Sequence, residues 1–210
     1  MARYFIVCFV LISSCLFAQQ TAVTQTGEQV VLYNDGRWEY VTKDTLRENE
    51  IRTNPDPFVK KKSANFLLKS SRIPVGFWID NDNWSFVKKA DYEAAEYELD
   101  HKSGSLYGLI ITEHLDVPLL SLANIALQNA RDAAPDIKVI EQEFRNVNGT
   151  TVLMMRMVGT IQDIRFSYFG YYFSGSGGST QFLVYTSEDY MAENLETVQD
   201  LLNGFVQTTE

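Results

Sequence analysis

Acid–base and metal chemistry have few candidate residues in this 210-residue chain, which contains only two histidines, His101 and His114. The best local cluster is Glu113-His114 with Asp116. Neighbouring strand residues point to opposite faces, so Glu113 and His114 could not bind one ion unless the chain bends between them. His101 lies in a polar turn just before Gly104, where we expect it to be solvated. We therefore predict ordinary surface roles for both histidines, with no catalytic residue, metal site or cofactor.

Carboxylates spaced two residues apart could supply an acid and a base, and the chain has two such pairs, Glu96 with Glu98 and Glu141 with Glu143. Both pairs alternate with other residue types as on a strand, so we expect them on solvated faces. The glycine-rich segment 175–178 resembles a phosphate-binding loop, but the next predicted element is a strand rather than a helix. We predict a flexible hairpin loop there.

Cysteine chemistry depends on the start of the chain, where residues 1–18 predict a secretory signal peptide that contains both Cys8 and Cys15. Arg3 precedes an apolar run, and Ala18 ends a small-residue cleavage site. The run has about half of the roughly 20 residues that a membrane-spanning helix needs, so we expect no transmembrane anchor. Cleavage would leave an exported chain without a thiol. The alternative is a lipobox, in which case Cys15 would bear a lipid tether.

The composition is that of a globular protein, with 45% hydrophobic and 21% charged residues. The formal net charge is −9, which makes nucleic acid and anionic lipid poor partners. A chain of this length can form one substantial core with an appendage. We therefore expect neither disulfides nor a nucleic-acid-binding role.

Residues 19–41 are predicted to form a β-hairpin module, because residues 27–41 alternate in the manner of a hairpin and the aspartate-glycine pair at 35–36 predicts a two-residue turn. That turn would place Tyr33 opposite Trp38 and give the hairpin one aromatic face. An isolated hairpin is marginally stable in water, so this module either docks on the main domain or binds a partner. In the same register Val31 would face Tyr40.

A polar segment with two prolines follows at residues 42–63, and we interpret it as a linker. Its three consecutive lysines, residues 60–62, are then a solvated charge run. The main domain is predicted to occupy residues 64–210.

Within the main domain, alternation predicts a strand near 95–99 beside a more apolar strand at 106–111. Pro118 and the Ala-Pro pair at 134–135 delimit a helix with a buried apolar stripe. Ser187 predicts the cap of one last helix that stops at 203–204. The apolar stripe of that last helix is Met191, Leu195, Val198, Leu202 and Phe205.

The asparagine-glycine pair at 148–149 gives the clearest structural signal, because it closes a hairpin whose two arms alternate consistently. The register predicts an ion pair between Glu141 and Arg156. Strands at 164–173 and 181–185 would complete a four-stranded antiparallel meander. The other pairs in this register are Val147 with Thr150, Arg145 with Val152, Phe144 with Leu153, Glu143 with Met154, Gln142 with Met155, and Ile140 with Met157.

Aromatic residues occupy both faces of the predicted strand at 164–173. If a helix covers one face, the aromatics of the other must meet water, the hairpin module or a ligand. The candidate binding residues are therefore Tyr33, Trp38 and Tyr40 of the hairpin, and Phe169, Tyr171 and Phe173 of the strand.

The order of strands, helix, four-stranded meander and helix over residues 74–205 resembles the PsbP-like superfamily, together with the turn at 147–149 and the closing segment 201–205. The resemblance implies an α+β fold, an αβα sandwich in which two main helices flank the antiparallel sheet. Residues 27–40 separately resemble a small module found at the start of exported bacterial proteins. Neither resemblance supplies a catalytic residue.

The function that follows from these expectations is a non-enzymatic binding or assembly module, exported to the periplasm or secreted, whose partner is another protein of the bacterial cell envelope. The alternative is a small-ligand carrier or hydrolase that uses His114 with nearby carboxylates. That alternative requires a concave pocket where His114 and an acid converge.

Overall fold

The computed structural model describes residues 20–24, 29–32, 36–40, 51–90 and 93–208. The predicted signal peptide, both cysteines and Tyr33 lie outside these ranges. Strands make up most of the regular structure in the described part, and the fold is α+β, as predicted. No helix in the described ranges is both long enough and apolar enough to cross a membrane.

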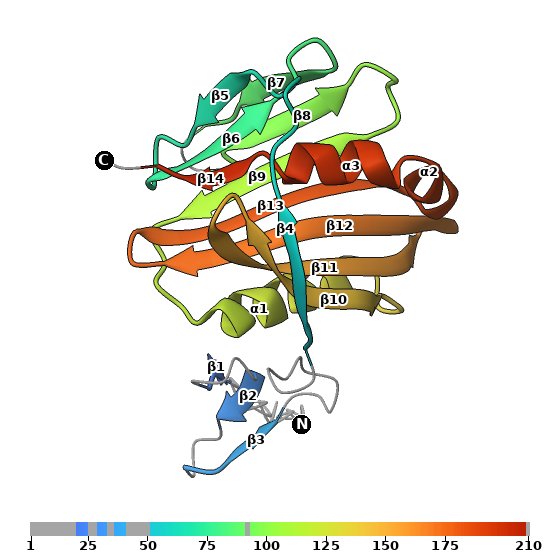
Figure 1. The fold of residues 1–210 in the computed structure, drawn as a ribbon. Helices are drawn as coiled ribbons and strands as arrows, with labels where there is room; N and C mark the ends of the chain where they lie inside the picture. The colour runs from blue at the N-terminus through green and yellow to red at the C-terminus, as the bar shows by residue number, and fades with distance from the viewer. Residues whose placement is uncertain (1–19, 25–28, 33–35, 41–50, 91–92, 209–210) are drawn as a thin grey trace, which may run out of the picture.

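An eight-stranded sheet forms the centre of the fold (Figure 1). Its neighbouring strands are antiparallel except for the outermost pair, β4 and β10, which is parallel. In spatial order the strands are β4 (Thr53–Phe58), β10 (Lys138–Val147), β11 (Thr150–Ile161), β12 (Ile164–Gly175), β13 (Gly178–Ser187), β9 (Tyr107–Glu113), β8 (Tyr97–His101) and β7 (Trp84–Lys88).

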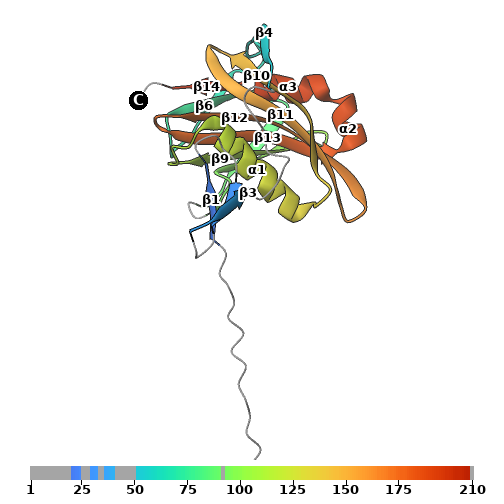
Figure 2. The ribbon, with the colours of Figure 1, turned by 90° about the horizontal axis from the view of Figure 1, so that it is seen from below.

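Two different layers cover the two faces of this sheet, so each face has its own apolar core (Figures 1 and 2). On one face lies α1 (Leu119–Ala133), packed against residues of β11 and β12. The other face is covered by α2 (Glu188–Glu193), α3 (Leu195–Leu202) and a second small sheet. The strands of that sheet, in spatial order, are β14 (Phe205–Gln207), β6 (Val75–Ile79) and β5 (Phe66–Lys69).

The predicted meander is present as β10–β11–β12–β13, and its first hairpin has the predicted register. Asn148 and Gly149 both have positive φ, 50° and 87°, as a two-residue primed turn requires. The Arg156 Nη1–Glu141 Oε2 ion pair is formed at 3.0 Å. One pair is wrong: a bulge shifts the register, so that Val139 rather than Ile140 faces Met157. The bulge leaves Ile140 46% exposed.

The first predicted helix corresponds to α1, whose N-cap is Pro118. The last predicted helix is broken at Asn194 into α2 and α3, so the prediction of one continuous helix with a single apolar stripe is wrong. Phe205 is not helical but belongs to β14, where it pairs with Phe77. The chain leaves the helix at Asn203-Gly204, as predicted, and the residues that follow extend the small sheet.

The predicted linker at 42–63 is wrong in its second half, because residues 53–58 form β4 at the edge of the main sheet. Pro55 and Pro57 are compatible with this position, since an edge strand has one side that needs no backbone donors. The backbone amide of Phe144 donates to Arg52 O, and that of Asn148 donates to Phe58 O. These bonds hold β4 parallel to β10.

The amino-terminal module is a three-stranded antiparallel sheet rather than a simple hairpin. Its middle strand pairs Leu32, not Tyr33, with Trp38, and Val30, not Val31, with Tyr40. The predicted register is therefore wrong by one residue, which exchanges the faces of that strand. The three strands are β1 (Gln20–Val23), β2 (Gln29–Leu32) and β3 (Trp38–Tyr40).

The glycine-rich segment joins β12 to β13, which confirms the predicted hairpin connection. The connection is tight rather than a long flexible loop, because Gly175 pairs with Gly178 and leaves only two residues between them. Gly178 has φ +134°, and a Cβ there would lie 2.3 Å from the Glu113 carbonyl oxygen. Only glycine fits this close approach of two backbones.

Candidate functional site

The aromatic strand β12 is not an exposed binding surface, which corrects the expectation for Phe169, Tyr171 and Phe173. These side chains are only 3%, 1% and 8% exposed. They form part of the core between the main sheet and the layer of α2, α3 and the small sheet. The helix α1 covers the opposite face, where Tyr172 is equally buried. Aromatics on both faces of β12 are needed because both faces of the sheet are covered.

Among the predicted binding residues whose side chains the structure describes, the exposed one is Trp38 of the small amino-terminal sheet. Trp38 is 52% exposed, and Leu32, its cross-strand partner, is 37% exposed. Val30 lies on the same face and is buried. Tyr40 follows in β3, but its side chain, like Tyr33, lies outside the described structure. Trp38 with Leu32 is therefore the part of the predicted hairpin surface that the structure places.

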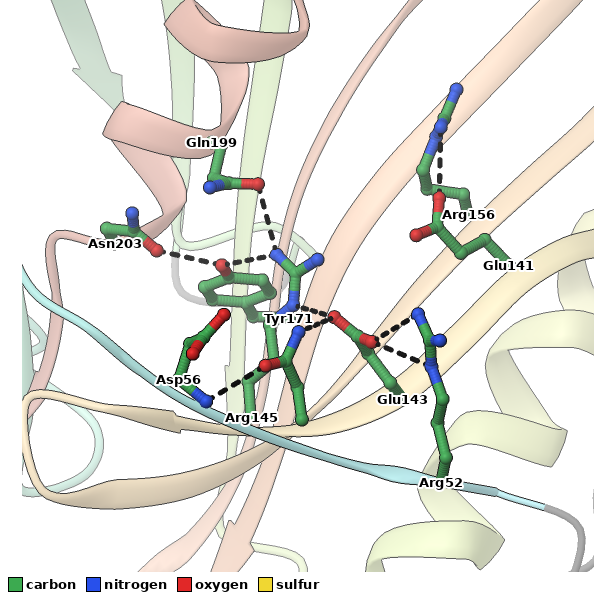
Figure 3. A network of polar contacts seen from close by, with 10 residues as sticks. Arg52, Asp56, Glu141, Glu143, Arg145, Arg156, Tyr171, Gln199 and Asn203 are labelled. Carbon is green, nitrogen blue, oxygen red and sulfur yellow. Dashed lines mark hydrogen bonds and ion pairs between the residues drawn. The ribbon is translucent and has the colours of Figure 1, made fainter.

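A buried carboxylate, Glu143, organises a polar network in the main domain (Figure 3). Its Oε1 accepts hydrogen bonds from Arg145 Nε at 2.7 Å and from Asn54 Nδ2 at 2.9 Å. Arg52 Nε donates to Oε2 at 3.1 Å. The expectation that Glu143 is solvated is wrong, since the residue is 1% exposed. Arg52, just before β4, and Asn54, within it, thus cover a carboxylate that β10 turns inward.

The same network continues from Arg145 towards α3 (Figure 3). Arg145 Nη1 donates to Tyr171 Oη at 3.1 Å and to Gln199 Oε1 at 3.3 Å. Tyr171 Oη donates to Asn203 Oδ1 at 2.8 Å. The guanidinium carbon of Arg145 also lies 4.3 Å from the centroid of the Phe58 ring. The network joins β4, β10, β12 and α3, and it gives Tyr171 a structural role.

Hydrogen bonding decides the charge state of this network. Burial tends to raise the pKa of Glu143, but hydrogen bonds from Asn54 and Arg145 outweigh burial and hold the pKa below its ordinary value. Burial raises the pKa of the Tyr171 phenol, although Arg145 opposes the shift. Glu143 is therefore an anion and Tyr171 a neutral donor near neutral pH. Their bonds are all made within the chain, as expected of a structural ion pair.

A second carboxylate, Glu96, is fully buried immediately before β8, which again corrects the expectation of a solvated face. Ser70 Oγ donates to Glu96 Oε2 at 2.6 Å, and Thr112 Oγ1 donates to the same oxygen. Ser71 donates to Oε1 from its backbone nitrogen at 2.6 Å and from its hydroxyl at 2.8 Å. The carboxylate thereby fastens the segment between β5 and β6 to the main sheet.

We expect Glu96→Gln to reduce the pH dependence of stability. Burial tends to raise the pKa of Glu96, but hydrogen bonds from Ser70, Thr112 and Ser71 lower it below the ordinary value. A lowered folded-state pKa stabilises the fold above the unfolded pKa, and this contribution is lost as pH falls through the folded pKa. The variant should be about 2 kcal/mol less stable at pH 7. Urea unfolding from pH 7 to about pH 3 should show the gap between the two proteins narrowing.

The matched control is Glu98→Gln, because Glu98 is two residues away and its side chain is 47% exposed in an ion pair with Lys89. That exposed pair should contribute less than about 1 kcal/mol. The role of the buried carboxylate would be contradicted if the loss of unfolding free energy in Glu96→Gln did not change with pH. It would also be contradicted if that loss equalled the loss in Glu98→Gln.

A pocket of about 320 Å³ lies between β6, the start of β7, the end of β8 and α3. Trp78 and Trp84 supply its ring surfaces. The remaining lining residues are Lys61, Ser63, Ala64, Asp80, Asn83, His101, Lys102, Thr197, Asp200 and Leu201.

Local structure holds both tryptophans in place. Asp80 closes the turn that leads into β7, where its backbone oxygen accepts from the amides of Asn83 at 3.1 Å and Trp84 at 2.8 Å. Trp84 is buried and its ring lies 4.9 Å from the ring of His101, its cross-strand partner. Lys60 Nζ lies 4.7 Å above the Trp78 ring. Trp84 is therefore held by its burial and its neighbours, and one ring face of Trp78 is next to Lys60.

Charges around the pocket are partly paired. Lys61 Nζ lies 2.5 Å from Asp200 Oδ2 and 2.9 Å from Glu196 Oε1, and these partners raise the pKa of Lys61 to about 12. Burial raises the pKa of Asp200, and Lys61 only partly offsets this shift. The ion pair has the larger effect on the pKa of Lys61, which is the more exposed partner, whereas burial has the larger effect on the pKa of Asp200.

The structure places His101 in this pocket, so the expectation of a solvated turn residue is wrong. His101 is half-buried against Trp84 and is hydrogen-bonded through Nδ1 to Ser103 Oγ at 2.9 Å. Burial, and then the charge of Lys102, lower its pKa, although Asp80 opposes the shift. The missed signal was the β7–β8 hairpin, which pairs Trp84 with His101.

The other predicted cluster stays at the surface. Glu113, His114 and Asp116 are all exposed where the chain leaves β9 for α1, and none of them lines the pocket. Among the described residues, no group of three or more histidine, cysteine or acidic side chains is arranged to hold a metal ion. The convergence that a His114-based site requires is therefore not formed in the described part, and that alternative stays a prediction.

Comparison with known proteins identifies the fold. No family model matches the sequence, and no curated protein matches it either. The fold is similar to cyanobacterial PsbP (CyanoP) from Synechocystis sp. PCC 6803, with a TM-score of 0.52 and 12% identity, covering 68% of this chain and 91% of that one. PA94 from Pseudomonas aeruginosa, a protein of unknown function, has a TM-score of 0.46 and 11% identity over 69% of this chain and 98% of that one. The chain thus has a PsbP-like fold.

Proposed function

We propose that this chain is an exported, non-enzymatic module that binds another protein of the bacterial cell envelope through its amino-terminal sheet. The observation that supports this proposal is the exposed Trp38–Leu32 pair, 52% and 37% exposed on one face of a small sheet. A partly exposed tryptophan beside an aliphatic side chain is the kind of anchor that dominates many protein interfaces.

Export is supported by the amino-terminal sequence, in which a basic residue, a short apolar run and a small-residue site occur in the order of a signal peptide.

The test is in-cell crosslinking and capture of the carboxy-terminally tagged full-length chain, compared with a Trp38→Ala variant. We expect a specific crosslinked protein that is strongly reduced in the variant, because truncating an anchor residue costs about 2 kcal/mol or more of binding free energy.

Ile164→Ala is the matched control, since Ile164 is also 52% exposed but lies in β12 of the main domain. Capture should be unchanged in this control. Equal capture by the wild type, Trp38→Ala and Ile164→Ala would remove the amino-terminal sheet from the interface.

A further inference from the structure

The pocket beside Trp78 and Trp84 has the size and lining of a small-molecule site. Its volume of about 320 Å³ is at the lower end of the range for ligand pockets, roughly 300–1,000 Å³. Trp78, which is partly exposed, offers an apolar wall, and Ser63 and Thr197 add hydroxyl groups to the lining. A ligand with a flat apolar body fits this combination, and a whole protein domain does not.

The acids that line the pocket already have partners within the chain. Asp80 Oδ2 accepts from Asn83 Nδ2 at 2.7 Å, and Asp80 Oδ1 accepts from the backbone amide of Asp82 at 3.2 Å. Asp200 is paired with Lys61 at 2.5 Å. A cationic ligand would have to displace these bonds.

Lys102, unlike Lys61, is not matched in the same way. Lys102 lines the pocket and is exposed, and no described carboxylate forms an ion pair with it. Its neighbour His101 is held by Trp84 on one side and by Ser103 on the other. A negative group in the pocket would therefore lie near Lys102, which has no acidic partner among the described residues, and near the imidazole of His101.

We propose that this pocket binds a small organic carboxylate, with the flat body of the ligand against Trp78 and its carboxylate facing Lys102. The site is separate from the protein-binding surface proposed above, because Trp38 belongs to the amino-terminal sheet. Loss of either function would leave the other intact.

The chain supplies a direct test, because it has two histidines and only His101 lines the pocket. The full-length protein is titrated with phenylacetate, benzoate and indole-3-acetate while proton NMR follows both imidazoles. A bound carboxylate should raise the pKa of His101, because the anion stabilises the imidazolium, and should leave the exposed His114 unchanged. The corresponding amides have the same ring and no charge, so they should leave both histidines unchanged.

Lys102→Gln should weaken carboxylate binding about tenfold, since a hydrogen bond to a charged group is lost. Lys88→Gln is the control, because Lys88 is also exposed but lies in β7 outside the pocket lining, and it should bind as the wild type does. Three results would each overturn the proposal: no carboxylate saturates His101 below about 10 mM, the amides bind as tightly as the acids, or the two lysine variants bind alike.

Discussion

Replacing Arg145 with methionine is expected to destabilise the fold by about 3 kcal/mol or more, because it leaves a buried carboxylate without its closest cation. Glu143 would keep Arg52 and Asn54, but Arg52 is largely exposed and is a weaker partner. Tyr171 and Gln199 would lose their shared donor as well. Methionine retains an unbranched chain against Phe58, so the loss reports the polar contacts more than the packing. The measurement is urea unfolding at pH 7.

Arg165→Met is the matched control for this experiment, because Arg165 also pairs with a glutamate, Glu188, but both side chains are substantially exposed. We expect that substitution to cost less than about 1 kcal/mol. A second substitution, Glu143→Gln in the Arg145→Met background, should recover part of the stability by removing the unpaired charge. Equal losses for Arg145→Met and Arg165→Met would show that the network in Figure 3 does not stabilise the fold.

Gly204→Ala is the second substitution with a large expected effect. A Cβ at residue 204 would lie 2.0 Å from the Trp78 carbonyl oxygen and 2.9 Å from the Leu201 carbonyl oxygen. Backbone atoms cannot move aside as a flexible side chain can, so the junction between α3 and β14 must separate from β6. That separation would break the hydrogen bond from Trp78 N to Gly204 O at 2.8 Å. We expect a loss of about 3 kcal/mol or more in urea unfolding.

Gly149→Ala separates this steric effect from the general cost of losing a glycine. Gly149 has φ +87°, but a Cβ there would meet nothing within 4 Å. Alanine at this position should cost only about 1–2 kcal/mol, which is the conformational penalty of the left-handed region. If Gly204→Ala costs no more than Gly149→Ala, the close contact with Trp78 is not a constraint on the fold.

Local signals in the sequence were sufficient for the elements whose boundaries and pairing depend on short-range chemistry. The turn at Asn148-Gly149 requires positive φ at both residues, and this requirement specified the register of β10 and β11 down to the Glu141–Arg156 ion pair. Pro118 at the start of α1 was also a sufficient boundary signal. These features need no information from distant segments.

Pairing was mispredicted where a distant strand supplies the stabilisation. The polar sequence of β4, with two prolines, has no strand pattern of its own, and it is a strand because β10 provides backbone partners. The predicted register of the amino-terminal sheet was wrong by one residue, because the turn alone specifies pairing in a short sheet only weakly. The break at Asn194 between α2 and α3 was likewise not evident from the apolar spacing.

The sequence by itself determined the α+β class, the meander and the helix α1, because alternation, helical spacing and turn residues act over a few positions. Only the tertiary structure decided which polar residues are buried. Glu96 and Glu143 resemble other alternating acids in sequence, and they become buried because segments 70–71 and 52–54 fold over them and supply donors. The pocket has the same origin: Trp78, His101 and Asp200 are far apart along the chain, and the packing of α3 and the β7–β8 hairpin about β6 brings them to one cavity.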